Sequence, residues 1–146
     1  MDAFDGDRFG CWITSNTYQT SVYPNSYQGS VVTSASGTQL RGEWIQIDLP
    51  TRIKPVTYTI NSCAATQLIG QKPLSWALLG SNKKDWVLLD REEENASWSQ
   101  AIQITMDANV TSFKSFRLVI LESQQSNSEA VVPISIGEIR IEGIRG

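Results

Sequence analysis

The residues of this chain that could do chemistry are carboxylates, amides and aromatic rings. The chain contains no histidine, which is the commonest general base and metal ligand. A Gly-x-Ser-x-Gly nucleophile elbow and a glycine-rich phosphate loop are also absent from the sequence. Two carboxylates can hydrolyse glycosides, but every acidic residue here serves equally well as a surface charge. We therefore expect that the protein is not an enzyme.

Length and composition predict one globular domain. The chain has 146 residues, of which 40% are hydrophobic and 18% charged, enough for one core but not for two. The net charge is -3 and no basic run occurs, which argues against binding to nucleic acid. No apolar run approaches the roughly 20 residues of a transmembrane segment. The first residues are acidic, unlike the basic start of a signal peptide.

Cysteines and tryptophans add two expectations. Cys11 and Cys63 allow one intramolecular disulfide, although free thiols in a reducing compartment are favoured. The sequence has five tryptophans, and four of them lie in or beside predicted strands. We expect these four in the core: Trp12, Trp44, Trp76 and Trp86.

Residues 42–50 are the strand on which the interpretation rests. Their side chains alternate strictly between two faces, which is typical of a half-buried strand. The apolar face carries Ile45, Ile47 and Leu49, and the opposite face carries Trp44, Gln46 and Asp48. Pro50 is expected to end the strand, because proline cannot donate a hydrogen bond to a sheet.

The rest of the chain predicts further strands and no convincing helix. The expected strands cover residues 29–34, 56–60, 75–81, 86–90, 102–106, 115–121 and 134–141, with a charged loop at 91–95. In the last strand the isoleucine pairs are out of phase, which predicts a β-bulge at Gly137–Glu138 and a second phase shift at Gly143. The expected fold is an all-β antiparallel sandwich, or jelly roll.

Several segments resemble the discoidin family, also called the coagulation factor V/VIII C-type domain. They are AFDGD at 3–7 with Trp12, GEWIQIDLP at 42–50, PLSW at 73–76, LGS at 79–81, FRL at 116–118 and IGEI at 136–139. They occur in the family's order over nearly the whole chain. The resemblance implies a jelly roll of the galactose-binding type. A tyrosine-rich insertion at residues 18–42 is similar to that of modules encoded by large DNA viruses and marine microbes.

The chain departs from the family pattern in three ways. Family members usually carry about one more strand before the entry motif, so residues 1–146 are expected to be a single domain that lacks its first strand or is cut from a longer chain. The cysteines that join the ends of the blood-clotting members are missing. The histidine that many sugar-binding members use is missing as well.

The resemblance implies a structural Ca²⁺ ion between the entry loop and the closing glutamate. Ca²⁺ prefers 6–8 oxygen ligands, which carboxylates and amides supply. The residues placed on these positions are Asp2, Asp5, Asp7, Asn16 and Glu138. In the alternative interpretation, Asp5 and Asp7 only stabilise turns through their own backbone.

The ligand face is expected in the loops at one end of the sandwich. An aromatic platform with planar polar groups suits a sugar, whereas the lipid-binding members insert apolar side chains into a membrane, as Leu68 and Ile69 would. The candidate residues are Tyr18, Tyr23, Asn25, Tyr27, Arg41, Leu68, Ile69 and Trp98. Alternatively, the tyrosines pack down their own loop.

Two functions remain open at this stage. The first is a non-catalytic binding module for a glycan or another cell-surface ligand, as in cell adhesion. The second is a structural role as a decoration or cementing protein of a viral capsid, with other subunits as partners. The expected location is a virion surface or the extracellular face of a larger assembly, in a chain that has no signal peptide of its own.

Overall fold

The computed structural model describes residues 12–13, 18–19, 31–61, 73–93, 101–107, 110–123, 131–132, 135–136 and 138–145. Every regular element within these ranges is a β-strand. None of these residues lies in a helix long and apolar enough to cross a membrane. The predicted all-β antiparallel fold is confirmed.

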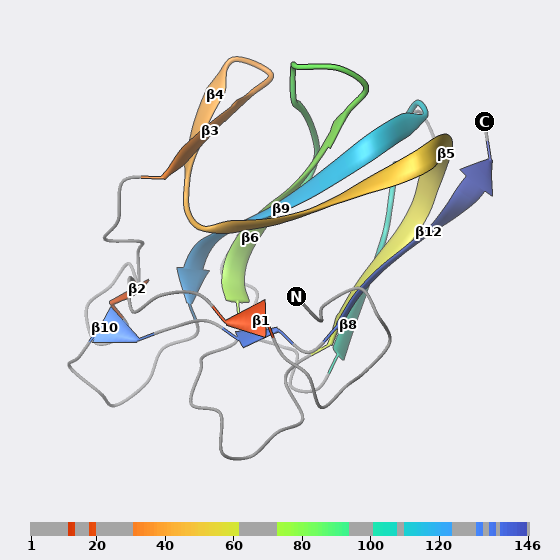
Figure 1. Ribbon diagram of the computed structural model, residues 1–146. Helices are drawn as coiled ribbons and strands as arrows, with labels where there is room; N and C mark the ends of the chain where they lie inside the picture. The colour runs from red at the N-terminus through yellow and green to blue at the C-terminus, as the bar shows by residue number, and fades with distance from the viewer. Residues whose placement is uncertain are drawn as a thin grey trace.

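One curled antiparallel sheet contains most of the described residues (Figure 1). Its strands are β5 (Trp44–Asn61), β6 (Pro73–Ser81), β7 (Val87–Glu92), β8 (Ala101–Thr105), β9 (Phe113–Ser123) and β12 (Glu138–Arg145). The order is β12-β5-β9-β6-β7, and β8 also pairs with β5. The remaining strands form three short pairs: β3 (Val32–Ala35) with β4 (Thr38–Arg41), β1 (Trp12–Ile13) with β11 (Ser135–Ile136), and β2 (Tyr18–Gln19) with β10 (Val131–Val132).

Strand β5 is far longer than expected, and the prediction that Pro50 ends it is wrong. Its first half pairs with β9 as far as Asp48, and the register then shifts before Ile53. Pro50 lies in this unpaired bend and has no ladder bond to donate, so proline is tolerated there. After the bend, the second half of β5 runs beside β12 and β8 (Figure 1). A single strand thereby contributes to both layers of the fold.

The main core lies between the two halves of this curled sheet. It contains the predicted inward residues Ile45, Ile60, Trp76, Leu118 and Ile120. A short chain of hydrogen bonds joins the layers inside it: the Trp76 Nε1–H donates to the Tyr58 hydroxyl at 2.8 Å, and that hydroxyl donates to Asp90. Burial first, and the hydrogen bond to Asp90 second, raise the pKa of Tyr58 above its ordinary value.

The opposite face of the sheet carries a second, smaller core. Alternate residues of β6 and β9 point to this side, where the β3–β4 hairpin covers them. The cluster consists of Ala35, Leu40, Ala77, Leu79 and Val119, with Trp86, Leu88 and Leu121 packed against it. Burial on both faces explains why every residue of β6 is buried.

The closing strand β12 confirms one of the two predicted phase shifts. Its register against β5 shifts between Glu142 and Gly143, opposite Pro55. A Cβ on Gly143 would lie 2.3 Å from the Lys54 carbonyl oxygen, so the backbone as it stands has room only for glycine. The other predicted position, Gly137–Glu138, lies between two strands with different partners: β11 before it pairs with β1, and β12 after it pairs with β5. Gly137 itself lies outside the described residues. The predicted charged loop at 91–95 starts later than expected, because β7 extends to Glu92.

Candidate functional site

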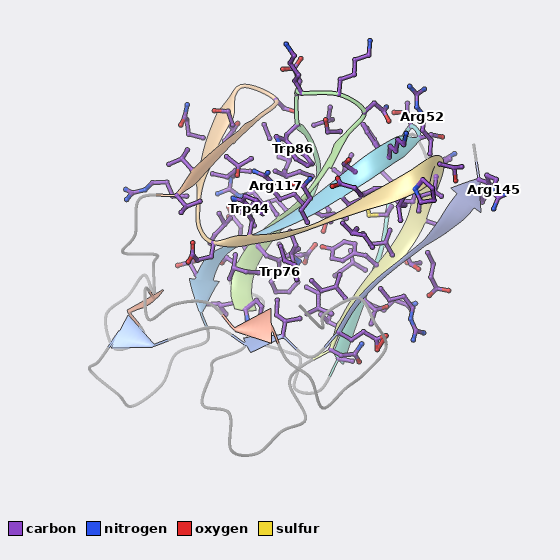
Figure 2. All side chains as sticks on the ribbon, viewed as in Figure 1. Trp44, Arg52, Trp76, Trp86, Arg117 and Arg145 are labelled. Atoms are coloured by element: carbon purple, nitrogen blue, oxygen red, sulfur yellow. The ribbon has the colours of Figure 1, made fainter. Side chains whose placement is uncertain are left out.

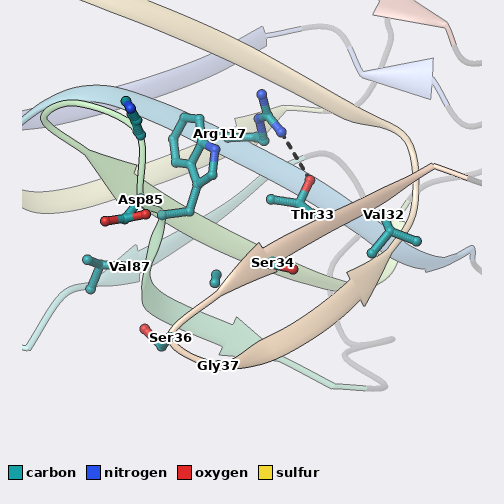
Figure 3. Close-up of a pocket in the computed structure, with 11 residues that line it drawn as sticks. Val32, Thr33, Ser34, Ser36, Gly37, Asp85, Val87 and Arg117 are labelled. Carbon is teal, nitrogen blue, oxygen red and sulfur yellow. Dashed lines mark hydrogen bonds between the residues drawn. The ribbon is translucent and has the colours of Figure 1, made fainter.

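A pocket of about 700 Å³ opens beside the β3–β4 hairpin, on the face of the second core. We call it the hairpin pocket. It is lined by residues 32–37 of the hairpin, residues 84–87 at the start of β7, and Arg117 of β9. In Figure 3, Val32, Thr33 and Ser34 of the hairpin lie on one side, Asp85 and Val87 lie on the other, and Arg117 lies beside Thr33. The volume is in the range of sites that bind small molecules.

The hairpin wall is fixed by a tight turn and by bonds to β7. Ser36 and Gly37 join the two strands and both have positive φ, at 50° and 79°. Gly37 adopts this conformation at little cost, whereas Ser36 is strained. Two hydrogen bonds hold Ser36: its N–H donates to the Trp86 carbonyl at 3.1 Å, and its hydroxyl accepts the Leu88 N–H at 3.0 Å. Positive φ at both residues is typical of a two-residue turn between hairpin strands.

Behind this wall, Arg117 is stacked between two tryptophans. Its guanidinium carbon lies 3.6 Å from the centroid of Trp44 and 4.5 Å from that of Trp86. In Figure 2 the side chains of Trp86, Arg117 and Trp44 lie close to one another on the sheet, beside the β3–β4 hairpin. A guanidinium between two indole rings is stabilised by cation–π attraction and keeps only its edge accessible.

Neutral side chains take up part of that edge. The Nε–H and an Nη2–H of Arg117 donate to the Gln46 Oε1 at 3.1 and 2.8 Å, and an Nη1–H donates to the Thr33 hydroxyl at 3.1 Å. The Gln46 amide in turn donates to Asp48 at 2.9 Å. Hydrogen bonds from Ser115 and then Gln46 lower the pKa of Asp48. Burial lowers the pKa of Arg117, and the nearby charge of Asp48 opposes this effect.

This arrangement is suited to binding. The pocket offers a half-buried indole ring from Trp86, hydroxyls from Thr33, Ser34 and Ser36, and a fixed cation from Arg117. Across the described part of the chain, no group of three or more His, Cys, Asp or Glu side chains is placed to hold a metal ion.

Most of the predicted site residues lie outside the described ranges. For the calcium site this applies to Asp2, Asp5, Asp7 and Asn16, and for the ligand face to Tyr23, Asn25, Tyr27, Leu68, Ile69 and Trp98. For Tyr18 only the backbone is described, as part of β2. Both of these sites therefore stay predictions.

Two predicted site residues can be placed. Arg41 is exposed at the end of β4, in register with Val32, which lines the hairpin pocket. Glu138 is buried at the start of β12, where its Oε2 accepts a hydrogen bond from the Arg140 Nη2 at 3.2 Å. Arg140 thus partly neutralises the one predicted calcium ligand that the structure describes.

The hairpin pocket was not predicted from the sequence. Trp44 was expected in the core, but it is 37% exposed and stacks on Arg117. The expectation is correct for Trp76, which is fully buried, and only partly correct for Trp86. A signal was present, because Trp44 shares its face of the strand with Gln46 and Asp48, both polar. Residues on that face were unsuited to an apolar core.

Comparison with known proteins supports the fold. No protein-family profile matches the chain, and no curated protein matches it. Solved structures do match over almost its full length. A chitosan-binding module of a Paenibacillus sp. IK-5 chitosanase/glucanase, solved with chitotriose, has a TM-score of 0.58 and 16% identity, over 97% of this chain and 84% of the module. CBM32-3, from a family 31 glycoside hydrolase of Clostridium perfringens, has a TM-score of 0.65 and 14% identity, over 97% of this chain and 80% of the module.

The fold is that of these carbohydrate-binding modules. A family 89 glycoside hydrolase of Clostridium perfringens also matches 98% of this chain, with a TM-score of 0.61 and 17% identity, but the chain spans only 12% of that enzyme's length. The similarity confirms the predicted jelly roll of the galactose-binding type. Membership of the discoidin family stays a prediction, because matches at this level of identity show the fold alone. The closer likeness to virus-encoded modules and the capsid role also stay predictions, since none of these matches is a viral protein.

Proposed function

We propose that the protein is a non-catalytic carbohydrate-binding module, and that the hairpin pocket is a site at which it binds a glycan. The observation that carries the proposal is the pocket itself: a half-buried Trp86 ring next to a fixed arginine and three hydroxyl side chains, in a fold shared with glycan-binding modules. The loops at the end of the sandwich remain a further candidate surface.

The chemistry of the pocket walls matches the chemistry of a sugar ring. A pyranose has an apolar face of C–H groups, which packs on an indole, and a rim of hydroxyls, which need hydrogen-bonding partners. Trp86 offers the indole, and Thr33 and Arg117 offer polar groups close to it. Since Ser36 bonds the hairpin to β7, these groups hold their spacing before a ligand arrives.

The proposal is tested by calorimetric titration of the protein with a panel of neutral and charged oligosaccharides, chitotriose included. We expect at least one to bind, and Ser34→Tyr to weaken that binding at least about tenfold, or about 1.4 kcal/mol. Ser34 is exposed and lines the pocket, so a tyrosine there adds bulk at the pocket without removing a core contact. Trp86→Ala should weaken binding similarly.

The control is Ile144→Ala, which removes an exposed apolar side chain from β12, away from the pocket. Its affinity should equal that of the wild type. Binding that survives both Ser34→Tyr and Trp86→Ala would place the glycan elsewhere on the molecule. If the folded protein binds no oligosaccharide of the panel, the proposed function is wrong.

A further inference from the structure

Within the described residues, Arg117 forms no ion pair with a carboxylate. Two ion pairs of the described residues, Arg91 with Glu93 and Arg140 with Glu138, leave Arg117 uninvolved. The hydrogen-bond acceptors of Arg117 are an amide oxygen and a hydroxyl, both neutral. Removing a cation from water is costly unless an opposite charge accompanies it. The site would therefore be stabilised by an anion.

Asp48, the carboxylate whose charge acts on Arg117, neutralises the guanidinium only in part. Asp48 influences Arg117 through its charge, but its carboxylate is bonded to Ser115 and Gln46. Gln46 stands between the two charges, with its oxygen toward Arg117 and its nitrogen toward Asp48. This fixes the orientation of the amide and keeps the carboxylate one side chain away from the guanidinium.

The remaining donors of Arg117 define how a ligand can approach. A guanidinium has five N–H donors, and the bonds to Gln46 and Thr33 use one on each nitrogen. Within the described residues, each terminal nitrogen thus keeps one N–H. The two tryptophans cover both faces, so a ligand has to approach in the guanidinium plane. Oxyanions that can place two oxygens in that plane, such as a carboxylate or a sulfate ester, suit this geometry.

The charges around the rim point the same way. Among the residues lining the pocket, Lys84 adds a second positive charge and Asp85 a single negative one. Lys84 and Asp85 are both exposed at the rim, whereas Arg117 is half-buried deeper in the pocket. Asp85 and Arg117 lie apart in Figure 3, with Arg117 on the side of Thr33. The inner part of the pocket is therefore positive and the outer rim mixed.

From these contacts we infer that the hairpin pocket selects sugars carrying an oxyanion, either the carboxylate of a uronic acid or a sulfate ester. The oxyanion lies against the guanidinium edge of Arg117, and the sugar ring lies toward Trp86 and the hairpin hydroxyls. The inference rests on the proposed function, since it names the class of glycan taken by the same site.

The experiment compares ligands that differ in charge and little else. The protein is titrated with trigalacturonate and, separately, with its methyl ester, in a low-salt buffer. The same comparison is made between 6-sulfated and unsulfated N-acetyllactosamine. We expect the charged member of at least one pair to bind at least about tenfold more tightly, as for a charge-assisted bidentate contact. The pair that shows this difference identifies the source of the oxyanion. Raising the salt concentration should narrow the difference.

Two variants assign the effect to the pocket. Arg117→Lys keeps the positive charge but loses the planar pair of donors, so the preference for the charged sugar should fall by at least about fivefold. Lys84→Met changes an exposed rim residue, leaves the packed residues intact, and should reduce the preference by about twofold to fivefold. Circular dichroism confirms that each variant is folded.

The outcomes separate the inference from the proposed function. If neutral and charged partners bind equally well, the oxyanion inference is wrong and the glycan-binding module stands. If inorganic sulfate or free acetate binds as tightly as the charged sugar, the site takes a bare anion and the inference is also overturned. If no sugar of either charge binds, the proposed function itself fails.

Discussion

Ser36 shows how one strained residue fixes a wall of the pocket. Its φ of 50° is unfavourable for a residue with a side chain, but its hydroxyl accepts the N–H of Leu88. Ser36→Ala loses the hydroxyl and keeps the strain, whereas Ser36→Gly loses the hydroxyl and removes the strain. We expect Ser36→Ala to lower the free energy of unfolding by about 1–2 kcal/mol, and Ser36→Gly by about 0.5–1 kcal/mol less.

Urea denaturation of the wild type, Ser36→Ala and Ser36→Gly measures these differences in the free energy of unfolding. Gly37→Ala is a useful companion, because a Cβ there meets no atom within 4 Å and its cost reports backbone strain alone, at a φ of 79°. An Ser36→Gly variant less stable than Ser36→Ala would show that strain at this turn is unimportant.

Folding should change the pKa of Tyr58 and thereby make the stability of the protein depend on pH. Its hydroxyl is buried between Trp76 and Asp90, and this burial raises its pKa. Above pH about 10 the unfolded chain can release the tyrosine proton while the folded chain retains it. The free energy of unfolding should then decrease with rising pH, by up to about 1.4 kcal/mol per pH unit from this group. Below pH about 10 the contribution is fully present.

Tyr58→Phe checks this prediction. The variant should be less stable at neutral pH, since the Trp76 N–H loses its buried acceptor. Its stability should nevertheless fall less steeply than that of the wild type above pH about 10. Parallel slopes in urea denaturation series across this pH range would contradict a buried neutral tyrosine.

At the scale of elements, Gly42 connects the β3–β4 hairpin to β5, at a point where the chain lies close to β9. A Cβ there would lie 1.9 Å from the backbone oxygen of Ile120 in β9, and a backbone atom cannot move aside alone. We expect Gly42→Ala to lower the free energy of unfolding by about 3 kcal/mol or more.

Gly143→Ala is the matched comparison. It also meets backbone, at 2.3 Å from the Lys54 oxygen, but it lies near the exposed end of β12, where the strand can shift. Its cost should be about 1–2 kcal/mol, measured by the same denaturation. Equal costs at both positions would show that the hairpin junction is no more constrained than a strand end.

Alternation along the strands predicted the fold well and the pocket poorly. In β5 and β9 it correctly assigned Ile45, Leu118 and Ile120 to the core. It did not reveal that the opposite face of β6 and β9 is covered as well. The covering element is the β3–β4 hairpin, whose two strands have four residues each and are distant in sequence from Arg117. The cavity depends on where the hairpin settles, and local periodicity carries no information about that placement.

The two prolines of β5 illustrate a different limit. Proline usually argues against the middle of a sheet. Here Pro50 falls in the bend between two sets of partners, and Pro55 lies opposite the Gly143 bulge. Each proline is tolerated because the missing N–H falls where the ladder is interrupted. Recognising this from sequence would require knowing the register of β9 and β12 beforehand.

For the whole molecule, ligand binding should appear as added thermal stability. A glycan that binds only the folded state, at a concentration of about 100 times its Kd, stabilises by about 2.7 kcal/mol. In a domain of this size that corresponds to a rise in Tm of roughly 5–10 °C. Differential scanning fluorimetry with and without the best ligand measures the shift. Because its affinity should be at least about tenfold lower, Ser34→Tyr should show at most about half of this shift at the same ligand concentration. An equal shift in that variant would place the ligand outside the hairpin pocket.

The bonds between the hairpin and β7 have a consequence for kinetics. Because Ser36 ties both walls together through the Trp86 carbonyl and the Leu88 amide, the cavity is preorganised and a ligand has little backbone to order on arrival. Encounter rates should then be similar for related sugars, and discrimination between them should lie in residence time. Loosening that tie would shorten the residence time of every ligand.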